Sequence, residues 1–131
     1  MRLLLVFAFL LSFGIVTAQE TGSVNPNGFN IFYYPNGAKS SEGNLLNGKP
    51  DGIWKAYHEN GNLKSEGNRV NGKLEGAWSF FNEDGTPAAI YNYVGGTKNG
   101  IQKEFYSNKT IRAEEPMVNG VKQGVAKYYS E

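Results

Sequence analysis

Glycine recurs every 24 residues through most of this chain, and that period constrains the fold more than any other feature of the sequence. It is marked by five glycines, Gly28, Gly52, Gly76, Gly100 and Gly124. An aromatic residue follows each glycine by five positions: Tyr33, Tyr57, Phe81, Phe105 and Tyr129. A fixed period of this length indicates a repeat architecture, in which each unit buries apolar surface against the next copy.

The period also sets the domain organisation. Residues 19–27 are polar and form a flexible leader, and residues 28–131 form a single repeat domain. The domain divides into the units 28–51, 52–75, 76–99, 100–123 and a truncated unit 124–131.

Each unit reads as two strands joined by tight turns. The first strand follows the periodic glycine and is rich in aromatic and β-branched residues, and Asn-Gly or Asp-Gly comes next in units one to three. Tight turns connect only antiparallel neighbours. The sequence therefore predicts an all-β fold, an elongated antiparallel meander of about nine strands built from stacked β-hairpin repeats.

The turn in unit four differs from the others, because it has Asn108-Lys109 where the equivalent turns of units one to three have Asn-Gly or Asp-Gly. Lysine is sterically disfavoured at positive φ. We therefore expect this turn to be the loosest of the set, or to have a different shape.

Two registers are open for each hairpin. A two-residue turn at Asn60-Gly61 would place Lys55 opposite Glu66. A three-residue turn with a glycine bulge would shift the pairing by one residue and gather Tyr57 with Leu63. The second register is favoured because it collects the periodic aromatic residues with apolar partners. A one-residue slip swaps faces, so the two registers exclude each other over one hairpin.

The first eighteen residues are typical of a secretory signal peptide. Arg2 is followed by an apolar run and by small residues that predict cleavage between Ala18 and Gln19. The apolar run is short of the roughly 20 residues that a spanning helix needs. The expectation is an exported protein, secreted or periplasmic.

Composition argues against strongly electrostatic partners. Removing residues 1–18 takes away Arg2 and no acid, which leaves 12 basic and 12 acidic residues of the 13 and 12 in the whole chain. A balanced charge disfavours nucleic acid as a partner. The chain has no cysteine, so packing and ladder hydrogen bonds must hold the repeat domain together.

No residue pattern indicates catalysis, a metal or a cofactor. His58 is the only histidine, and it is best explained as a partly exposed residue at a strand end. The acidic pairs Glu83-Asp84 and Glu114-Glu115 point to opposite faces of a strand, so neither pair converges on one substrate atom. We therefore expect a non-enzymatic protein.

Aromatic residues are the most informative candidates for binding. The proposed interaction surface consists of Trp54, Trp78, Tyr34, Tyr57 and Tyr106. Exposed aromatic side chains suit contacts with a protein or a glycan.

The terminal strands, 29–34 and 125–130, would have unpaired edges that invite self-association. The C-terminal edge, with Val125, Tyr128 and Tyr129, is the favoured joint because the last unit stops in mid-repeat and Pro35 can blunt the first strand.

The repeat resembles the MORN-repeat variant found in many bacterial proteins. The residues that carry the resemblance in unit two are Gly52, Trp54, Tyr57, Asn60, Gly61, Leu63, Glu66, Gly67, Asn71, Gly72 and Lys73. Later units depart from this pattern: Pro87 replaces Leu63, Tyr91 and Glu115 replace Gly67, and Gln102 replaces Trp54.

The resemblance implies an elongated sheet of stacked hairpins that binds other proteins or, in some members, lipid head groups. It implies no catalytic residue. The expected function is a non-catalytic exported scaffold with an unknown protein partner; the alternatives are a module for cell-envelope glycan or lipid, and an antitoxin-like component of a toxin–antitoxin pair. An export signal fits the last alternative poorly, because an antitoxin works beside a cytoplasmic toxin.

Overall fold

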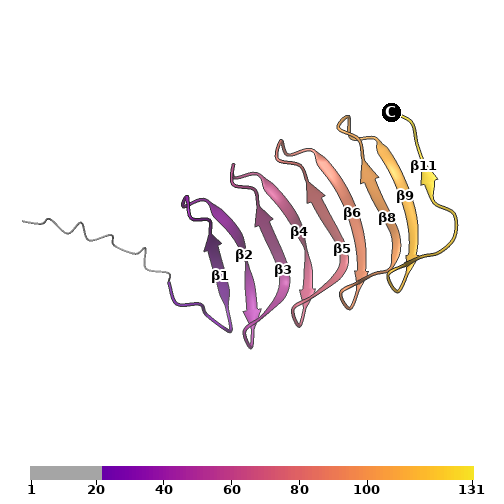
Figure 1. Cartoon of the computed structure of the whole chain (residues 1–131). Coiled ribbons are helices and arrows are strands. Elements are labelled where there is room, and N and C mark those ends of the chain that lie inside the picture. The colour runs from indigo at the N-terminus through magenta and orange to yellow at the C-terminus, as the bar shows by residue number, and fades with distance from the viewer. Residues whose placement is uncertain (1–21) are drawn as a thin grey trace, which may run out of the picture.

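The computed structural model describes residues 22–131, so the predicted signal peptide lies outside the described residues. The described chain forms one antiparallel sheet whose strands follow one another across the sheet in sequence order (Figure 1). The strands are curved, and β1 and β11 stand at opposite ends of the array (Figure 1). The predicted all-β meander of stacked hairpins is confirmed.

Strand boundaries follow the repeat. The strands of the first three units are β1 (Phe29–Tyr33), β2 (Lys39–Leu46), β3 (Lys49–Tyr57), β4 (Leu63–Val70), β5 (Lys73–Phe81) and β6 (Pro87–Val94). The remaining strands are β7 (Thr97–Lys98), β8 (Gly100–Phe105), β9 (Ile111–Val118), β10 (Val121–Lys122) and β11 (Lys127–Tyr128). The pairs β7/β8 and β10/β11 each occupy the place of one longer strand, so the regular strand breaks up progressively toward the C-terminus.

Two kinds of turn alternate along the sheet. Asn71 and Gly72, like their equivalents in the other units, both have positive φ and close a two-residue hairpin. The amide of Gly72 also donates to the carbonyl of Pro50 in the preceding unit, over 2.8 Å. Equivalent bonds recur at Gly48, Gly96 and Gly120. Each closing turn therefore ties its unit to the one before it, and the first, through Gly48, ties unit one to Pro26 of the leader.

The other turn is the three-residue form that the sequence favoured. His58 and Asn62 bracket it through a bond from the His58 amide to the Asn62 carbonyl, and Gly61 adopts a φ of 92°. Tyr57 pairs with Leu63, as that register requires.

The expectation that the two registers exclude each other is wrong. Lys55 still pairs with Glu66, because a bulge between Ala56 and Tyr57 shifts the register inside the hairpin. One extra residue on β4 absorbs the difference, so each segment keeps its own pairing.

The core lies on one face of the sheet, which we call the packed face. All buried residues of the described chain alternate onto this side: Asn30, Gly43, Leu45, Trp54, Ser65, Gly67, Trp78, Ala89, Gln102 and Ala113. The indole of Trp54 covers Gly43 on the neighbouring strand, and the indole of Trp78 covers Gly67. Each tryptophan thus lies over a glycine, so a single layer buries its own largest side chains.

Unit four preserves the tryptophan hydrogen bond without the tryptophan. The Nε1 groups of Trp54 and Trp78 donate to the carbonyls of Asn44 and Asn68. Gln102 takes the tryptophan position, is only 3% exposed, and donates through Nε2 to the equivalent carbonyl of Asn92. Tyr91 fills the place of the covered glycine. Glutamine, which is smaller than tryptophan, therefore occurs together with tyrosine, which is larger than glycine, in the paired positions 102 and 91.

The unit-four turn keeps the common shape, contrary to expectation. Lys109 adopts a φ of 72°, its amide donates to the Tyr106 carbonyl over 2.9 Å, and the Tyr106 amide donates to the Thr110 carbonyl. The hairpin imposes its geometry on the lysine, and the sequence departure is accommodated as backbone strain.

Lys109→Gly is therefore expected to raise the free energy of unfolding by about 1 kcal/mol, measured by urea denaturation. The matched variant is Gly61→Lys, which makes the reverse change in a turn where a Cβ would meet no atom within 4 Å. It should lower stability by a similar amount. Equal stability of Lys109→Gly and the parent would show that the turn is unstrained.

Candidate interaction surface

The second face of the sheet, which we call the open face, presents most of the exposed apolar side chains. No residue on this face is buried, and the described residues form no second layer over it. Its exposed apolar residues are Phe29, Ile31, Tyr33, Leu46, Ile53, Val70, Val94, Ile101, Val118, Val121 and Tyr129. An apolar surface of this extent is typical of an interaction site.

The open face is organised in rows that cross the strands, because residues of equivalent position in successive units are neighbours. One row contains Tyr33, Tyr57, Phe81, Phe105 and Tyr129, as the period predicted. Leu63, Pro87 and Ile111 pair with members of this row and extend it across the intervening strands. The repeat thereby turns a short motif into a continuous, half-exposed aromatic band.

A charged row runs through the middle of the open face. Glu42, Lys55 and Glu66 stand opposite one another on β2, β3 and β4. The alternation resumes at Lys103, Glu114 and Lys127. The two uncharged positions between them are Ser79 and Ile90. Alternating signs leave the row neutral as a whole, so this surface does not select a strongly charged partner.

A third row lies at the closing turns. The aliphatic rim consists of Leu46, Val70, Val94 and Val118, all between 47% and 56% exposed. Lysines adjoin it: Leu46 pairs with Lys49 and Val70 pairs with Lys73 across their turns. The rim therefore combines exposed aliphatic groups with neighbouring positive charges.

The structure removes both tryptophans from the predicted interaction surface. Trp54 is 9% exposed and Trp78 is 3% exposed, because each indole packs over a glycine on the packed face. Phe32 stacks on Trp54 with ring centroids 6.2 Å apart, and Arg69 lies over the Trp78 ring. These two residues belong to the core and are unavailable to a partner.

Tyr34 and Tyr106 make bonds between units. The Tyr34 hydroxyl donates to the Tyr57 carbonyl over 2.6 Å, and the Tyr106 hydroxyl donates to the Tyr129 carbonyl over 2.7 Å. The Nε2 atom of His58 lies 2.9 Å from the Phe81 carbonyl, which is the equivalent contact in unit two. This position therefore links neighbouring units whether it holds tyrosine or histidine.

Tyr57 remains on the half-exposed aromatic band, where it contacts charged neighbours. Its hydroxyl donates to Glu42, and the Lys39 ammonium lies 5.3 Å from the centre of its ring. Burial and the bond to Glu42 raise the pKa of Tyr57 to about 12. On the packed face, burial and the bond to Glu104 raise the pKa of Tyr91 to about 12.

These shifts predict a loss of stability at alkaline pH. The ordinary tyrosine pKa is 10.0, so the folded protein holds these two protons more tightly than the unfolded chain. Stability should be full below pH 10 and should fall as the pH rises toward about 12. Absorbance at about 295 nm, the tyrosinate band, should show late-titrating tyrosines that Tyr57→Phe and Tyr91→Phe each reduce. Retention of the full late phase in both variants would contradict the assignment.

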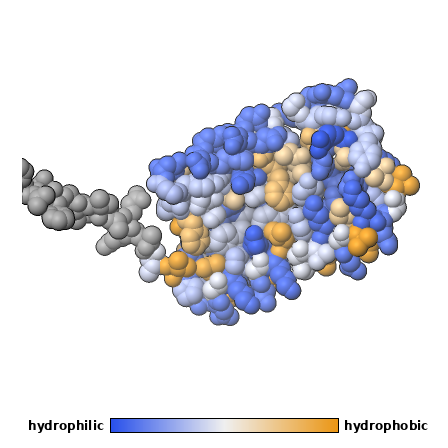
Figure 2. Space-filling view, in the orientation of Figure 1, coloured by the Kyte–Doolittle hydropathy of each residue, from blue (hydrophilic) through white to orange (hydrophobic). Residues whose placement is uncertain are grey.

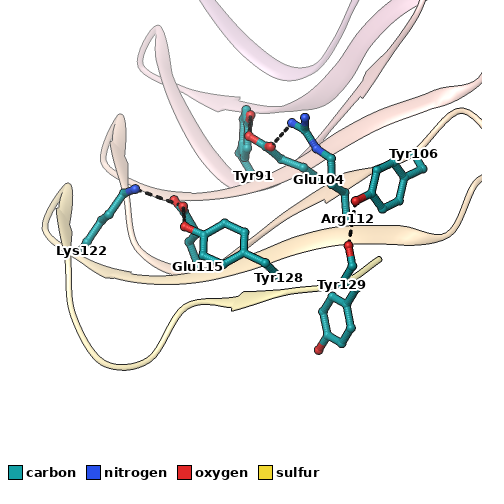
Figure 3. A network of polar contacts seen from close by, with 8 residues as sticks. All are labelled: Tyr91, Glu104, Tyr106, Arg112, Glu115, Lys122, Tyr128 and Tyr129. Atoms are coloured by element: carbon teal, nitrogen blue, oxygen red, sulfur yellow. Dashed lines mark hydrogen bonds and ion pairs between the residues drawn. The ribbon is translucent and has the colours of Figure 1, made fainter. Parts of the chain in front are cut away.

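The C-terminal end of the packed face carries a polar network (Figure 3). Glu104 accepts hydrogen bonds from Tyr91 and Arg112. Further along, Glu115 accepts from Lys122 and from the hydroxyl of Tyr128. The bonds from Lys122 and Tyr128 hold the pKa of Glu115 below its ordinary value. At this end of the packed face, hydrogen bonds between polar side chains connect the strands in place of the tryptophan–glycine contacts.

The predicted edge residues differ in their surroundings. Val125 is 80% exposed and lies between the short strands β10 and β11. Tyr128 pairs with Ala113 and is held by Glu115, and the Tyr129 amide donates to the Arg112 carbonyl. The last strand is therefore anchored to β9 at its end and interrupted in its middle.

Ile53 and Ile101 were not predicted from the sequence; they are exposed aliphatic residues of the open face, beside the charged row. Ile53 is 55% exposed and Ile101 is 43% exposed. A signal was present: each directly precedes the tryptophan position, and strand alternation sends such a neighbour to the opposite side. Once the tryptophan is assigned to the core, the isoleucine must face outward.

The described residues hold no cluster of metal-ligating side chains. Residues 22–131 contain no group of three or more His, Cys, Asp or Glu side chains that could hold a metal ion. Within the same range, no helix is long and apolar enough to cross a membrane.

Comparison with known proteins agrees with this geometry. The family model described as MORN repeat variant matches residues 50–71, 74–94 and 98–119. These three matches correspond closely to the successive units around β3 to β9, which carry both faces described above. No curated protein of similar sequence matches the chain. The repeated unit, its spacing and its stacking place this chain in the MORN repeat variant family.

Proposed function

We propose that this protein is a non-catalytic, exported scaffold that binds a protein partner through the open face. MORN repeats are typically modules for interaction with proteins or membrane lipids. The observation that carries the proposal is the placement of the exposed apolar side chains. Eleven of them lie on the open face, while the packed face buries both tryptophans.

The chemistry of the open face fits a protein surface of mixed character. Aromatic and aliphatic rows supply area that a partner can bury. The charged row between them alternates in sign and fixes alignment, because a misplaced partner would meet like charges. A partner with apolar residues flanking a neutral, charge-alternating strip satisfies all three rows.

The double variant Ile53→Ser/Ile101→Ser tests this proposal. The tagged protein would be expressed in its native host, and stoichiometric co-purifying proteins would be quantified by mass spectrometry. We expect the double variant to lose about tenfold or more of the captured partner, because central apolar contacts dominate interface energy. The matched control is Val125→Ser, which removes a more exposed aliphatic side chain from the irregular segment between β10 and β11 at the end of the sheet. Equal recovery with the parent and the double variant would refute binding through the open face.

A second candidate function rests on the aliphatic rim. Leu46 and Val70, with their partners Lys49 and Lys73, could insert into a lipid surface while the lysines meet anionic head groups. Sedimentation with vesicles containing phosphatidylserine distinguishes the candidates. Lipid binding requires that Leu46→Ser/Val70→Ser reduces sedimentation and that Ile53→Ser/Ile101→Ser does not. The buried tryptophans leave the glycan alternative without its strongest stacking residues.

A further inference from the structure

The two ends of the sheet differ in how well their free edges are protected. At the C-terminal end, β9 is covered by β10 and β11, two short strands separated by residues 123–126, which form no strand and include Gly124 at a φ of 86°. Lys122 and Lys127 stand on these pieces. Short, interrupted strands and charged side chains both hinder a sheet edge from pairing with another strand. The C-terminal edge is therefore a poor joint, contrary to what the truncated last unit suggested.

The N-terminal edge has none of these protections within the described chain. β1 is an uninterrupted strand of five residues, and its one register shift lies at its end, between Phe32 and Tyr33. The carbonyl of Gly28 accepts from the Leu45 amide, so Gly28 points toward β2. By alternation along an antiparallel ladder, Phe29, Ile31 and Tyr33 direct their main-chain groups away from β2, toward the free edge.

The side chains at this edge are apolar as well as exposed. Phe29, Ile31 and Tyr33 are 56%, 39% and 62% exposed. Together with the leader residues 22–25 they line an open groove of about 970 Å³. Figure 2 shows hydrophobic residues gathered at this end of the molecule, beside the point where the described chain begins. The groove therefore offers unpaired main-chain groups within an apolar surface.

No charge lies near this edge in the sequence. From residue 22 to residue 38 the chain contains no Asp, Glu, Lys or Arg, although charged residues make up 19% of the whole. Two copies can therefore bring this segment together without repulsion.

The strand sequence is self-complementary. Phe29-Asn30-Ile31-Phe32-Tyr33 has aromatic residues at both ends and isoleucine at its centre. In an antiparallel pair centred on Ile31, Phe29 meets Tyr33 of the second copy and Ile31 meets its own equivalent. Aromatic and β-branched pairs directly opposite each other are among the favourable cross-strand pairs. The same register pairs the three outward-pointing residues with one another.

We infer that the free edge of β1 pairs with the β1 edge of a second copy of this chain, which forms a two-fold symmetric dimer with a continuous sheet. Three ladder pairs make a short interface compared with the roughly 1,200 Å² of a standard specific complex. The dimer is therefore weak and depends on concentration. It leaves Ile53 and Ile101 uncovered, so the proposed partner surface is present twice in the dimer.

Cysteine trapping tests both the edge and its register, since the native chain has no cysteine. Ile31→Cys places two thiols across the two-fold axis, at the roughly 5.5 Å Cα separation that a disulfide accommodates. Tyr33→Cys alone places them roughly 13 Å apart, four residues along the strands. We expect mild oxidation to crosslink Ile31→Cys, to leave Tyr33→Cys monomeric, and to crosslink a mixture of Phe29→Cys and Tyr33→Cys.

The controls separate specific pairing from random collision. Val125→Cys exposes a thiol more fully at the opposite end of the sheet, and it should crosslink about tenfold more slowly at equal concentration. Analytical ultracentrifugation of the parent should show a monomer–dimer equilibrium that Ile31→Lys weakens roughly tenfold or more, because like charges then face each other. A parent that stays monomeric, or equal crosslinking of Val125→Cys and Ile31→Cys, would overturn the inference. Neither result bears on the open-face proposal, which is tested at different residues.

Discussion

Replacing Trp78 by alanine is expected to lower the free energy of unfolding by about 3–5 kcal/mol. Trp78 is the most deeply buried aromatic residue of the described chain, at 3% exposure. Its indole covers Gly67, packs against Phe80 at 6.4 Å between ring centroids, and donates to the Asn68 carbonyl over 2.9 Å. No second layer can move in to fill the space, because the described residues form a single sheet.

Urea unfolding followed by far-ultraviolet circular dichroism measures this loss without relying on the tryptophan signal. Val125→Ala is the matched control, since its side chain is 80% exposed and should change stability by less than about 0.5 kcal/mol. A loss below about 1 kcal/mol for Trp78→Ala would mean that main-chain ladders alone hold the array.

The hairpin array could be predicted because turn chemistry is local. Asn71-Gly72 requires two residues that accept positive φ, and few dipeptides satisfy that requirement. Lys109 shows the limit of the same reasoning. Its side chain disfavours positive φ, yet the hydrogen bonds of the flanking strands hold it at 72°. Residue preference predicts the turn, and the surrounding ladder decides the outcome where the two conflict.

The register was predictable only in part, because the sequence does not mark where a bulge falls. Lys55 opposite Glu66 and Tyr57 opposite Leu63 each satisfy a local rule. Choosing between them assumed a regular ladder. Because of the bulge between Ala56 and Tyr57, both pairings occur in the same hairpin. A bulge also bends its strand, which agrees with the curved strands in Figure 1.

The buried face was the main failure of sequence reasoning. Exposed tryptophans were expected because a thin sheet has aromatic residues on both sides and no partner layer. The missed signal is a correlation within the chain: Trp54 follows Gly43 by 11 positions, and Trp78 follows Gly67 by 11. Gln102 follows Tyr91 by the same interval. Residues that change together at a fixed spacing indicate contact, and contact with glycine indicates close packing.

That correlation leads to the second large prediction, on Gly67. A Cβ at Gly67 would lie 2.3–2.5 Å from three atoms of the Trp78 indole. Gly67→Ala is therefore expected to lower the free energy of unfolding by about 2–3 kcal/mol, and Gly67→Tyr by about 3 kcal/mol or more. The indole must leave its site, which also breaks its bond to the Asn68 carbonyl.

The contact between units three and four supplies the compensating change. Tyr91 and Gln102 occupy the positions of Gly67 and Trp78, and Gln102 Nε2 reaches the equivalent carbonyl over 3.3 Å. The double variant Gly67→Tyr/Trp78→Gln should therefore lose about 2 kcal/mol less than the sum of the two single variants. If a single variant fails to fold, a cooperative urea transition in the double variant shows the same coupling.

The mismatched pair Gly43→Tyr/Trp78→Gln tests whether this recovery depends on contact. Gly43, on β2, lies under Trp54 of β3, and two further strands, β3 and β4, separate it from Trp78 on β5. Losses at these sites should add more nearly than those of the matched pair, because Gly43 contacts Trp54 whereas Trp78 contacts Gly67. Equal recovery of unfolding free energy in the matched and mismatched pairs would mean that the gain comes from the residue types introduced and does not depend on their contact. Recovery confined to the matched pair would show that the glycine beneath each indole specifies which strands lie side by side.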